Sequence, residues 1–417
     1  MFKNKYEYIE KEQLKKYAEL AVYKGINVQK GQLVVIQCEI EDAIFARLIQ
    51  TVAYDAGASN VVVDWSDGQT EQLFYQHATD EWMDHAPDWL ATRYEEWDNK
   101  GAAYLIIESE NPGLLAESLS EKKLRYGKSL MTKVKEHSLK TRSYEQRWSI
   151  LDVPNLNWAK KVFPELSEEV ALSFLWQAIL KGARADGENP TKDWEAHGET
   201  LKRIKKYLNE TQFESLHFTN NLGTDLKVGL VKNHRYIGGD SRDQRGIPFF
   251  ANIPTEEIFT APHRFKVDGH LVATKPLSYH GSLIEDFTLS FKAGLIVDYT
   301  ARNGLEALKS IIETDEGSSY LGEISLVDNR SPLSQMDLLF YTTLFDENTG
   351  CHIGIGNAFP HNIENGAQLS EVELEEAGLN RSLTLVNITF GTADMKVIGL
   401  KNKGEEILIM EDGCFQI

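Results

Sequence analysis

Residues 339–356 read Leu-Phe-Tyr-Thr-Thr-Leu-Phe-Asp-Glu-Asn-Thr-Gly-Cys-His-Ile-Gly-Ile-Gly. The apolar and aromatic run, typical of a buried strand, ends in Asp346-Glu347-Asn348. A turn at Gly350 then leads to His352 in a glycine-rich segment with the character of another strand. Carboxylates, an amide and an imidazole rarely follow a buried strand unless they have a use there. The stretch therefore predicts a strand-rich region that carries a functional site.

Two acidic segments lie upstream of this stretch. Residues 254–262 (Pro-Thr-Glu-Glu-Ile-Phe-Thr-Ala-Pro) contain Glu257, and residues 314–323 begin with Thr-Asp-Glu-Gly and end at Glu323. Carboxylates and one imidazole that folding brings together suit a hard-to-borderline divalent cation. We expect these segments to meet around His352, together with residues 380–391 (Asn-Arg-Ser-Leu-Thr-Leu-Val-Asn-Ile-Thr-Phe-Gly).

Length and composition bound the class of protein. A chain of 417 residues can bury a large core and predicts two domains. The formal net charge of -19 repels phosphate backbones, so we expect no nucleic-acid partner. The sequence has neither an apolar run of membrane-spanning length nor the apolar core of a signal peptide. We therefore expect a cytoplasmic protein without a membrane partner.

The three cysteines, Cys38, Cys351 and Cys414, have no metal-knuckle spacing. An odd number without such spacing argues for a reducing compartment, and against both a disulfide framework and a cysteine-bound zinc. Cys351 beside His352 has two interpretations, a nucleophile or a small packing residue, and packing is the more common role of such a cysteine.

The N-terminal half predicts a parallel α/β domain. Helical spacing over 12–25 precedes a buried strand at 32–38, a helix at 44–56 and strands at 60–65 and 102–107. The glycines do not form a dinucleotide-binding fingerprint. Residues 114–208 read as mostly helical, with core anchors at Trp158, Phe163, Phe174 and Trp176.

The C-terminal half predicts a mixed, strand-rich α+β domain. Alternating segments at 222–228, 287–291 and 295–299 indicate strands, and residues 305–314 and 371–377 indicate helices. The fold class is therefore α/β, with an N-terminal domain over 1–212 and a metal-site domain over 213–417.

Several long segments resemble the metalloaminopeptidases of the aminopeptidase T, aminopeptidase S and PepS group. They are residues 254–262, 274–279 (Thr-Lys-Pro-Leu-Ser-Tyr), 313–317, 321–323, 343–348 and Cys351-His352, with 54–58, 158–164 and 223–226 in the first half. The resemblance covers essentially the whole chain. It implies a dimeric exopeptidase with two adjacent divalent cations (zinc, cobalt or manganese), and it places metal ligands at Glu257, Glu323 and His352.

The sequence departs from this family at three site positions. Where the family has His-Val-Asp-Phe-Met-Ile-Gly, with both His and Asp as ligands, this chain has Leu385-Val386-Asn387-Ile388-Thr389-Phe390-Gly391. Phe359 stands where the family has a tyrosine. We expect one cation rather than two, unless Asn387, His361 or Glu347 compensates.

Two functions remain open, with an oxygenase or transferase that uses a single cation on the same scaffold as a more distant third. The first is a metal-dependent aminopeptidase that releases N-terminal residues from short peptides, as a homodimer with a partly degraded metal site. The second is a catalytically impaired homologue that acts as a binding or regulatory protein. Glu256 is also consistent with a solvent-exposed or outer carboxylate, and Asp346 and Glu347 with turn caps. His197, His263, His270 and His280 read as packed or surface residues.

Overall fold

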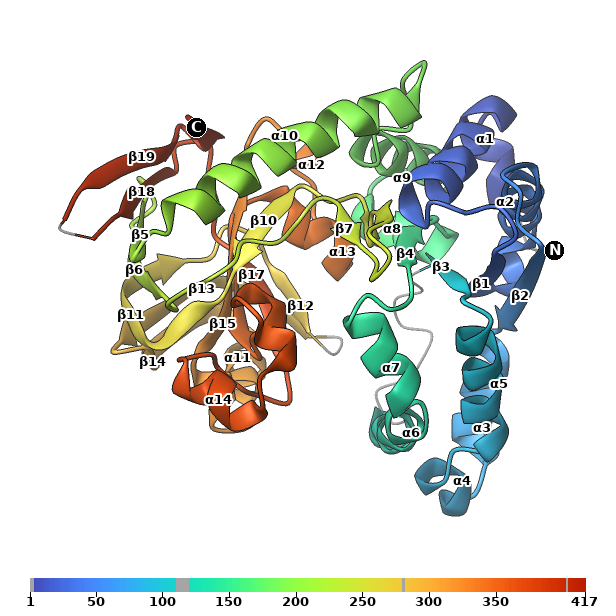
Figure 1. Ribbon diagram of the computed structural model, residues 1–417, viewed down its shortest axis with the longest axis horizontal. Helices are drawn as coiled ribbons and strands as arrows, with labels where there is room; N and C mark the ends of the chain where they lie inside the picture. The colour runs from blue at the N-terminus through green and yellow to red at the C-terminus, as the bar shows by residue number, and fades with distance from the viewer. Residues whose placement is uncertain (1–3, 110–119, 280–281, 403) are drawn as a thin grey trace. The chain divides into compact units, whose positions relative to one another are not determined.

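The computed structural model describes residues 4–109, 120–279, 282–402 and 404–417 (Figure 1). The chain forms two compact units, each assembled from separate segments. Unit one comprises 1–196 and 240–254, and unit two comprises 197–239 and 255–417. Helix α10 (Pro190–Thr211) begins in unit one and continues in unit two. The boundary after residue 212 stays a prediction.

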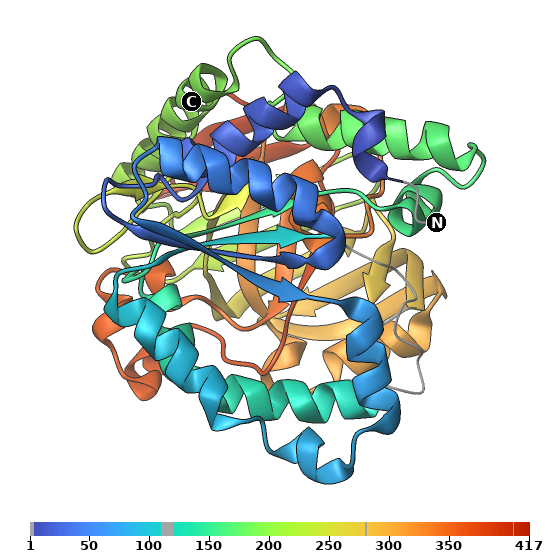
Figure 2. The ribbon, with the colours of Figure 1, turned by 90° about the vertical axis from the view of Figure 1, so that its right-hand side faces the viewer.

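Unit one is built on a parallel sheet of five strands in the order β2-β1-β3-β4-β9. In Figure 2 the blue and cyan arrows of this sheet run in the same direction. The strands are β1 (Leu33–Glu39), β2 (Asn60–Ser66), β3 (Ala103–Glu108), β4 (Trp148–Asp152) and β9 (Asn252–Ile253). A small two-stranded sheet pairs β7 (Ser241–Arg242) with β8 (Pro248–Phe249).

Helices cover both faces of this sheet. On one face, Tyr94 and Trp97 of α5 pack against Leu33 and Val35. Figure 2 shows α1 and α2, in darker blue, on the opposite side, where Tyr17 stacks on Phe45 with ring centroids 5.5 Å apart. The helices are α1 (Lys11–Leu20), α2 (Ala43–Asp55), α3 (Gly68–His77), α4 (Asp80–Asp84), α5 (Asp88–Asn99), α6 (Ser120–Lys133), α7 (Lys135–Arg142), α8 (Leu156–Val162) and α9 (Glu168–Gly182), with short turns at Lys5–Tyr8, Ala21–Gly25 and Ile40–Asp42.

The predicted core anchors of unit one differ in burial. Trp158 and Trp176 are fully buried, as expected. The prediction of Phe174 as a core residue is wrong. Its side chain is 46% exposed, and its ring meets the half-buried Phe163 edge-on at the surface. Helical spacing alone did not tell the inner face of α9 from its outer face.

Unit two contains two antiparallel sheets. The larger has the order β12-β13-β11-β6-β5-β18-β19-β20, with β14 also paired to β13, and the smaller has the order β10-β15-β16-β17. The larger sheet uses β5 (Ser215–Thr219), β6 (Asp225–Leu230), β11 (Pro262–Val272), β12 (Leu277–Tyr279), β13 (Ser282–Lys292), β14 (Leu295–Asn303), β18 (Lys396–Leu400), β19 (Glu406–Glu411) and β20 (Cys414–Phe415). The smaller uses β10 (Glu257–Thr260), β15 (Leu321–Val327), β16 (His352–Gly356) and β17 (Leu385–Thr389).

Short helices connect these strands. They are α11 (Leu305–Ile312), α12 (Pro332–Met336), α13 (Thr343–Asp346) and α14 (Glu371–Glu376), with single turns at Gly317–Ser319, Glu347–Thr349, Pro360–Asn362 and Gly366–Gln368. A capping box closes the start of α14, where Ser370 and Glu373 bond to each other's backbone N–H groups.

The α/β fold class predicted from the sequence is confirmed, with a parallel sheet and a strand-rich unit. The strand predicted within 339–345 is wrong, because residues 343–346 form the short helix α13. The Asp346 carboxylate accepts a hydrogen bond from the Phe340 N–H at 2.7 Å, which folds the apolar run into a compact turn. No helix among the described residues combines the length and apolarity needed to cross a membrane.

Candidate metal centre

The four-stranded sheet divides its side chains between two faces. Residues at alternate positions of β10, β15, β16 and β17 are buried apolar side chains of the main core of unit two: Ile258, Ile324, Leu326, Ile353, Ile355, Val386 and Ile388. Because side chains of a strand alternate between faces, the intervening residues share the other face. Those residues include Glu257, Glu323, Ser325, His352, Leu385 and Asn387.

The three residues that the resemblance assigns as ligands come together on this second face. The His352 Nε2 atom lies 3.1 Å from Glu257 Oε2 and 3.2 Å from Glu323 Oε1. One ligand atom from each residue lies within 4.8 Å of the other two, and all three residues are buried. Strand register produces this cluster, since Ser325 pairs with His352 and Glu323 pairs with Gly354.

Hydrogen bonds orient two of these side chains. The carbonyl oxygen of Gly350 lies 3.2 Å from His352 Nδ1, so Nδ1 carries the proton and Nε2 faces the carboxylates. The Ser325 hydroxyl donates to Glu257 Oε2 at 3.0 Å. Backbone and hydroxyl partners of this kind fix the direction of metal-binding side chains.

The electrostatic environment of the cluster of Glu257, Glu323 and His352 favours a positive charge there. Burial raises the pKa of Glu323. Burial lowers the pKa of His352, but its hydrogen bonds to Glu257 and Glu323 outweigh that effect and raise the pKa well above the usual range. Buried carboxylates this close to one another require a proton or a cation.

Glycines make room for the cluster. Gly322 is the extra residue of a β-bulge between Leu321 and Glu323, and such bulges redirect the side chains that follow them. A Cβ atom on Gly354 would lie 2.6 Å from Leu385 Cδ1, 2.8 Å from Glu323 Cβ and 3.0 Å from Asn387 Oδ1. Gly354 therefore lets side chains of β15 and β17 approach each other across β16.

Leu385 and Asn387 lie on the same face as the cluster, opposite Gly356 and Gly354 respectively. The Asn387 Nδ2 atom donates to Glu347 Oε2 at 2.8 Å. Its Oδ1 atom is buried and has no hydrogen-bond partner among the described residues. Asn387 therefore presents a free carbonyl oxygen beside Glu323, whereas Leu385 presents a hydrocarbon.

Glu347 lies beside Asn387 at this site, and the sequence had left it as either a compensating ligand or a turn cap. It lies in the turn Glu347–Thr349, and burial followed by the charge of Glu257 raises its pKa to about 8. Asn348 anchors that turn: its Oδ1 accepts from the Glu256 N–H at 2.6 Å and its Nδ2 donates to the Leu344 carbonyl at 2.8 Å. The acidic end of the 339–348 run was the only signal for Glu347 in the sequence.

Other acidic candidates have structural roles. Asp315 accepts hydrogen bonds from Ser382 and from the Leu383 N–H, which ties the segment before β17 to the 315–318 turn. Glu256 is buried rather than solvent-exposed, and its Oε2 lies 3.7 Å from His197 Nε2. Asp346 caps the backbone at Phe340.

Among the described residues, the other histidines and Phe359 lie outside the cluster of Glu257, Glu323 and His352. His263 and His270 are partly exposed, His361 is half-buried, and His280 lies outside the described residues. Phe359 is 39% exposed, and its ring meets Phe259 of β10 edge-on, with centroids 5.8 Å apart. Of the residues named as compensating ligands, Glu347 and Asn387 contact each other.

Cys351 has the environment of a packing residue. It is buried, and burial raises the pKa of its thiol to about 11. A thiol with such a pKa is a poor nucleophile at neutral pH.

The donor set fits a divalent cation. Two carboxylates and one oriented imidazole suit zinc, cobalt or manganese, and the unpartnered Asn387 oxygen adds a neutral donor nearby. Leu385, on the same face, supplies no donor atom.

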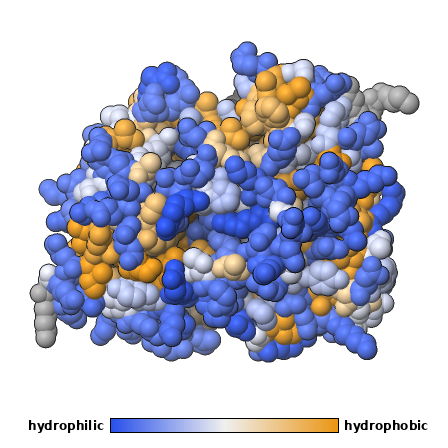
Figure 3. Space-filling model, turned by 90° about the horizontal axis from the view of Figure 1, so that it is seen from above, coloured by the Kyte–Doolittle hydropathy of each residue, from blue (hydrophilic) through white to orange (hydrophobic). Residues whose placement is uncertain are grey.

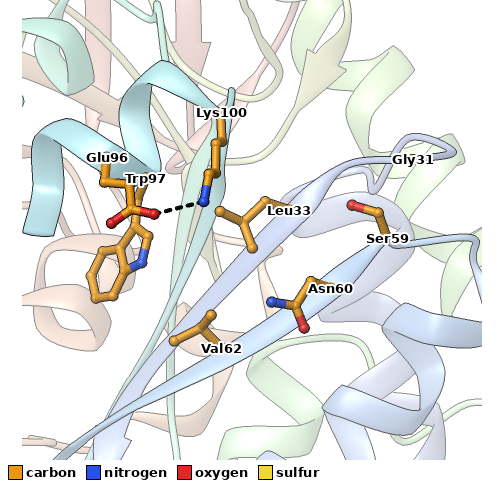
Figure 4. A pocket seen from close by; sticks show the side chains of 8 residues that line it. All are labelled: Gly31, Leu33, Ser59, Asn60, Val62, Glu96, Trp97 and Lys100. Carbon is orange, nitrogen blue, oxygen red and sulfur yellow. Dashed lines mark hydrogen bonds and ion pairs between the residues drawn. The ribbon is translucent and has the colours of Figure 1, made fainter.

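A separate hollow lies in unit one (Figure 4). Its volume is about 490 Å³, and its lining comprises Gly31, Leu33, Ser59, Asn60, Val62, Glu96, Trp97 and Lys100. The Lys100 Nζ atom lies 2.7 Å from Glu96 Oε1, so the two charges in the lining neutralise each other. This hollow contains none of the candidate metal ligands.

Comparisons with known proteins agree over nearly the full length. The family model described as thermophilic metalloprotease (M29) matches residues 10–415. Aminopeptidase AmpS of Bacillus subtilis (strain 168) is 42% identical over 402 residues, which are 96% of this chain and 98% of that protein. Aminopeptidase T of Thermus aquaticus is 36% identical, over 97% of this chain and 99% of that protein.

Two solved structures have a similar fold. Wild-type AmpT from Thermus thermophilus superposes with a TM-score of 0.91 at 36% identity, covering 98% of this chain and all 100% of that one. The 2,5-dihydroxypyridine dioxygenase of Pseudomonas putida KT2440 superposes with a TM-score of 0.51 at 11% identity, covering 97% and 96%. The second likeness concerns the fold alone.

Proposed function

The chain belongs to the thermophilic metalloprotease family M29, and from this premise we propose that it is a metal-dependent aminopeptidase acting on short peptides. The observation that carries the proposal is the convergence of Glu257, Glu323 and His352 on one buried point. Relatives named aminopeptidases support the choice of substrate.

In this proposal Glu257, Glu323 and His352 hold one divalent cation. Such an ion supplies Lewis acidity, which polarises a peptide carbonyl and lowers the pKa of water. The protein's contribution is orientation: Gly350 holds the imidazole, Ser325 holds Glu257, and the bulge at Gly322 directs Glu323. Burial of the cluster strengthens every charge interaction within it.

The second function, a binding or regulatory protein with impaired catalysis, has an observation of its own. Leu385 has no donor atom, and Asn387 offers a single neutral oxygen, so β17 provides only one weak ligand for a second ion. By the resemblance, Phe359 also lacks a hydroxyl that could stabilise a developing oxyanion. Loss of one such group commonly lowers the rate about a hundredfold or more.

The test is the metal content of the purified protein together with its activity. We expect about one equivalent of zinc, cobalt or manganese per chain, and hydrolysis of leucine or alanine anilides that a chelator abolishes and the metal restores. Glu323→Gln should lower metal affinity at least about tenfold. Glu316→Gln is the matched control, because that carboxylate is exposed and pairs with Arg264 instead.

A second arm separates the two functions. The double variant Leu385→His, Asn387→Asp should bind a second equivalent of metal and hydrolyse anilides faster. A protein that binds no metal contradicts the metalloenzyme proposal. One equivalent of metal without hydrolysis of the anilides favours the second function, a binding or regulatory protein with impaired catalysis. The homodimer implied by the resemblance stays a prediction, which sedimentation analysis of the same preparation would test.

A further inference from the structure

We propose that Asn387 and Glu347 bind the free α-ammonium group of the peptide, in the place that a second cation would otherwise take. This inference rests on the proposed function and assigns the substrate-binding groups of the same site. It concerns two residues that the sequence suggested as compensating metal ligands, with a turn cap as the alternative for Glu347.

The first observation is the unequal hydrogen bonding of the Asn387 amide. Its Nδ2 atom donates to Glu347 Oε2 at 2.8 Å, and this bond fixes which end of the amide points at the carboxylate. Its Oδ1 atom is buried and unpartnered among the described residues. A buried acceptor without a donor is destabilising, so a ligand that brings an N–H group relieves that cost.

The second observation is where this oxygen lies. Asn387 pairs with Gly354, which in turn pairs with Glu323, so Asn387 and Glu323 project on the same face from either side of a residue without a side chain. The position that a Gly354 Cβ would occupy is 3.0 Å from Asn387 Oδ1 and 2.8 Å from Glu323 Cβ. The free oxygen therefore lies beside the metal cluster.

The third argument is the choice of cation. An amide oxygen replaces a carboxylate poorly at a divalent ion but accepts well from an ammonium group, which has three donors to distribute. Glu347 keeps lone pairs that the Asn387 amide does not use. Leu385 Cδ1 lies 2.6 Å from the position that a Gly354 Cβ would occupy. Leu385 therefore fills the adjacent space with hydrocarbon and provides no donor atom for a second metal ion.

The test compares two small probes, L-leucinamide and N-acetyl-L-leucinamide, by titration calorimetry at pH 7. For the wild-type protein we expect leucinamide to bind at least about tenfold more tightly, the ratio expected for a charge-assisted hydrogen bond. Asn387→Leu and Glu347→Gln should each reduce the ratio to less than about threefold. Leu385→Ala is the control, because it changes the space but no hydrogen-bonding group, and it should keep the ratio.

The outcomes separate this inference from the proposed function. An unchanged ratio in Asn387→Leu overturns it, as do two equivalents of metal in the wild-type protein or failure of both probes to bind. The titration uses the protein as purified, with or without its ion. A missing metal therefore counts against the metalloenzyme, whereas the effect of Asn387→Leu on the ratio still decides the role of Asn387.

Discussion

At the scale of single residues, the absence of a side chain at Gly354 matters as much as the presence of the ligands. Glu323, Leu385 and Asn387 all approach the position where its Cβ would be, to within 3.0 Å or less. Each belongs to a strand whose register is set by backbone pairing, so none can withdraw without disturbing the sheet. One missing carbon thus determines the spacing of the site.

Gly354→Ala should lower metal affinity about tenfold or more, because the new methyl group displaces Glu323 from its place beside His352. Metal titration with a competing chelator measures the effect. Gly127→Ala is the matched control, since a Cβ there meets no atom within 4 Å, and it should bind metal as the wild type does. Equal affinities for the wild type and Gly354→Ala would contradict this account of the site.

His234 gives unit two a pH-dependent stability that is separate from the site. It is buried, its Nδ1 atom donates to the Val231 carbonyl at 3.1 Å, and burial lowers its pKa from 6.5 to about 4. The unfolded chain therefore binds a proton more readily than the folded one between these two values. Stability from this residue is complete above about pH 6.5 and is lost as the pH falls towards 4.

The expected loss is up to about 3 kcal/mol in the free energy of unfolding over that range. In His234→Asn, which keeps a donor but does not titrate, the part of the pH dependence due to this residue should disappear. Urea unfolding at several pH values measures the difference, with the exposed His77→Asn as control. Parallel pH profiles for wild type and His234→Asn would show that the imidazole does not carry the effect.

At the scale of elements, the turn after α13 brings Glu347 to the sheet. Asn348 is fully buried and bridges two segments, accepting from the Glu256 N–H and donating to the Leu344 carbonyl. The turn that bears Glu347 is thereby tied to the residue before Glu257. The hydrogen bonds of the Asn348 side chain, rather than strand pairing, therefore position Glu347 at the site.

Asn348→Ala should lower the free energy of unfolding by about 1–3 kcal/mol, because it leaves two buried backbone groups unpaired. It should also weaken leucinamide binding, since Glu347 loses its anchor. Chemical denaturation and calorimetry measure the two effects. Asn221→Ala, in an exposed loop, should change neither. A destabilised variant with unaltered leucinamide binding would place Glu347 outside the amine site.

At the scale of the whole molecule, the surface is strongly acidic and largely hydrophilic. The formal net charge is -19, and Figure 3 shows hydrophilic side chains over most of one face, with apolar patches between them.

Each unit combines two segments that are distant in sequence. In unit one, residues 240–254 return to pair β9 with β4, and the buried ion pair of Arg147 and Asp243 secures that return.

Arg147→Met should destabilise unit one by about 3–5 kcal/mol. The Asp243 carboxylate loses its buried partner and keeps only the exposed Arg245, and the Ile26 carbonyl and Gln32 Oε1 each lose a donor. Hydrogen exchange of the β4 and β9 amides, together with urea unfolding, measures the loss. Arg242→Met, which removes an exposed guanidinium 3.8 Å from Asp240, should cost no more than about 1 kcal/mol. Similar losses in the two variants would mean that the buried pair does not hold the segment.

The sequence by itself determined the class of fold, three strands of the parallel sheet in unit one and three of the larger sheet in unit two, because hydrophobic periodicity is a local property. It also indicated Glu257, Glu323 and His352, through a resemblance over the whole chain. It did not predict the helix over 343–346 or the exposure of Phe174, and it left Glu347 as either a turn cap or a compensating ligand. Only the tertiary structure decided those, since they depend on which distant groups a side chain meets. Strand register placed Asn387 beside Glu323, a hydrogen bond from Asn387 oriented Glu347, and the nearby Gly350 carbonyl oriented His352.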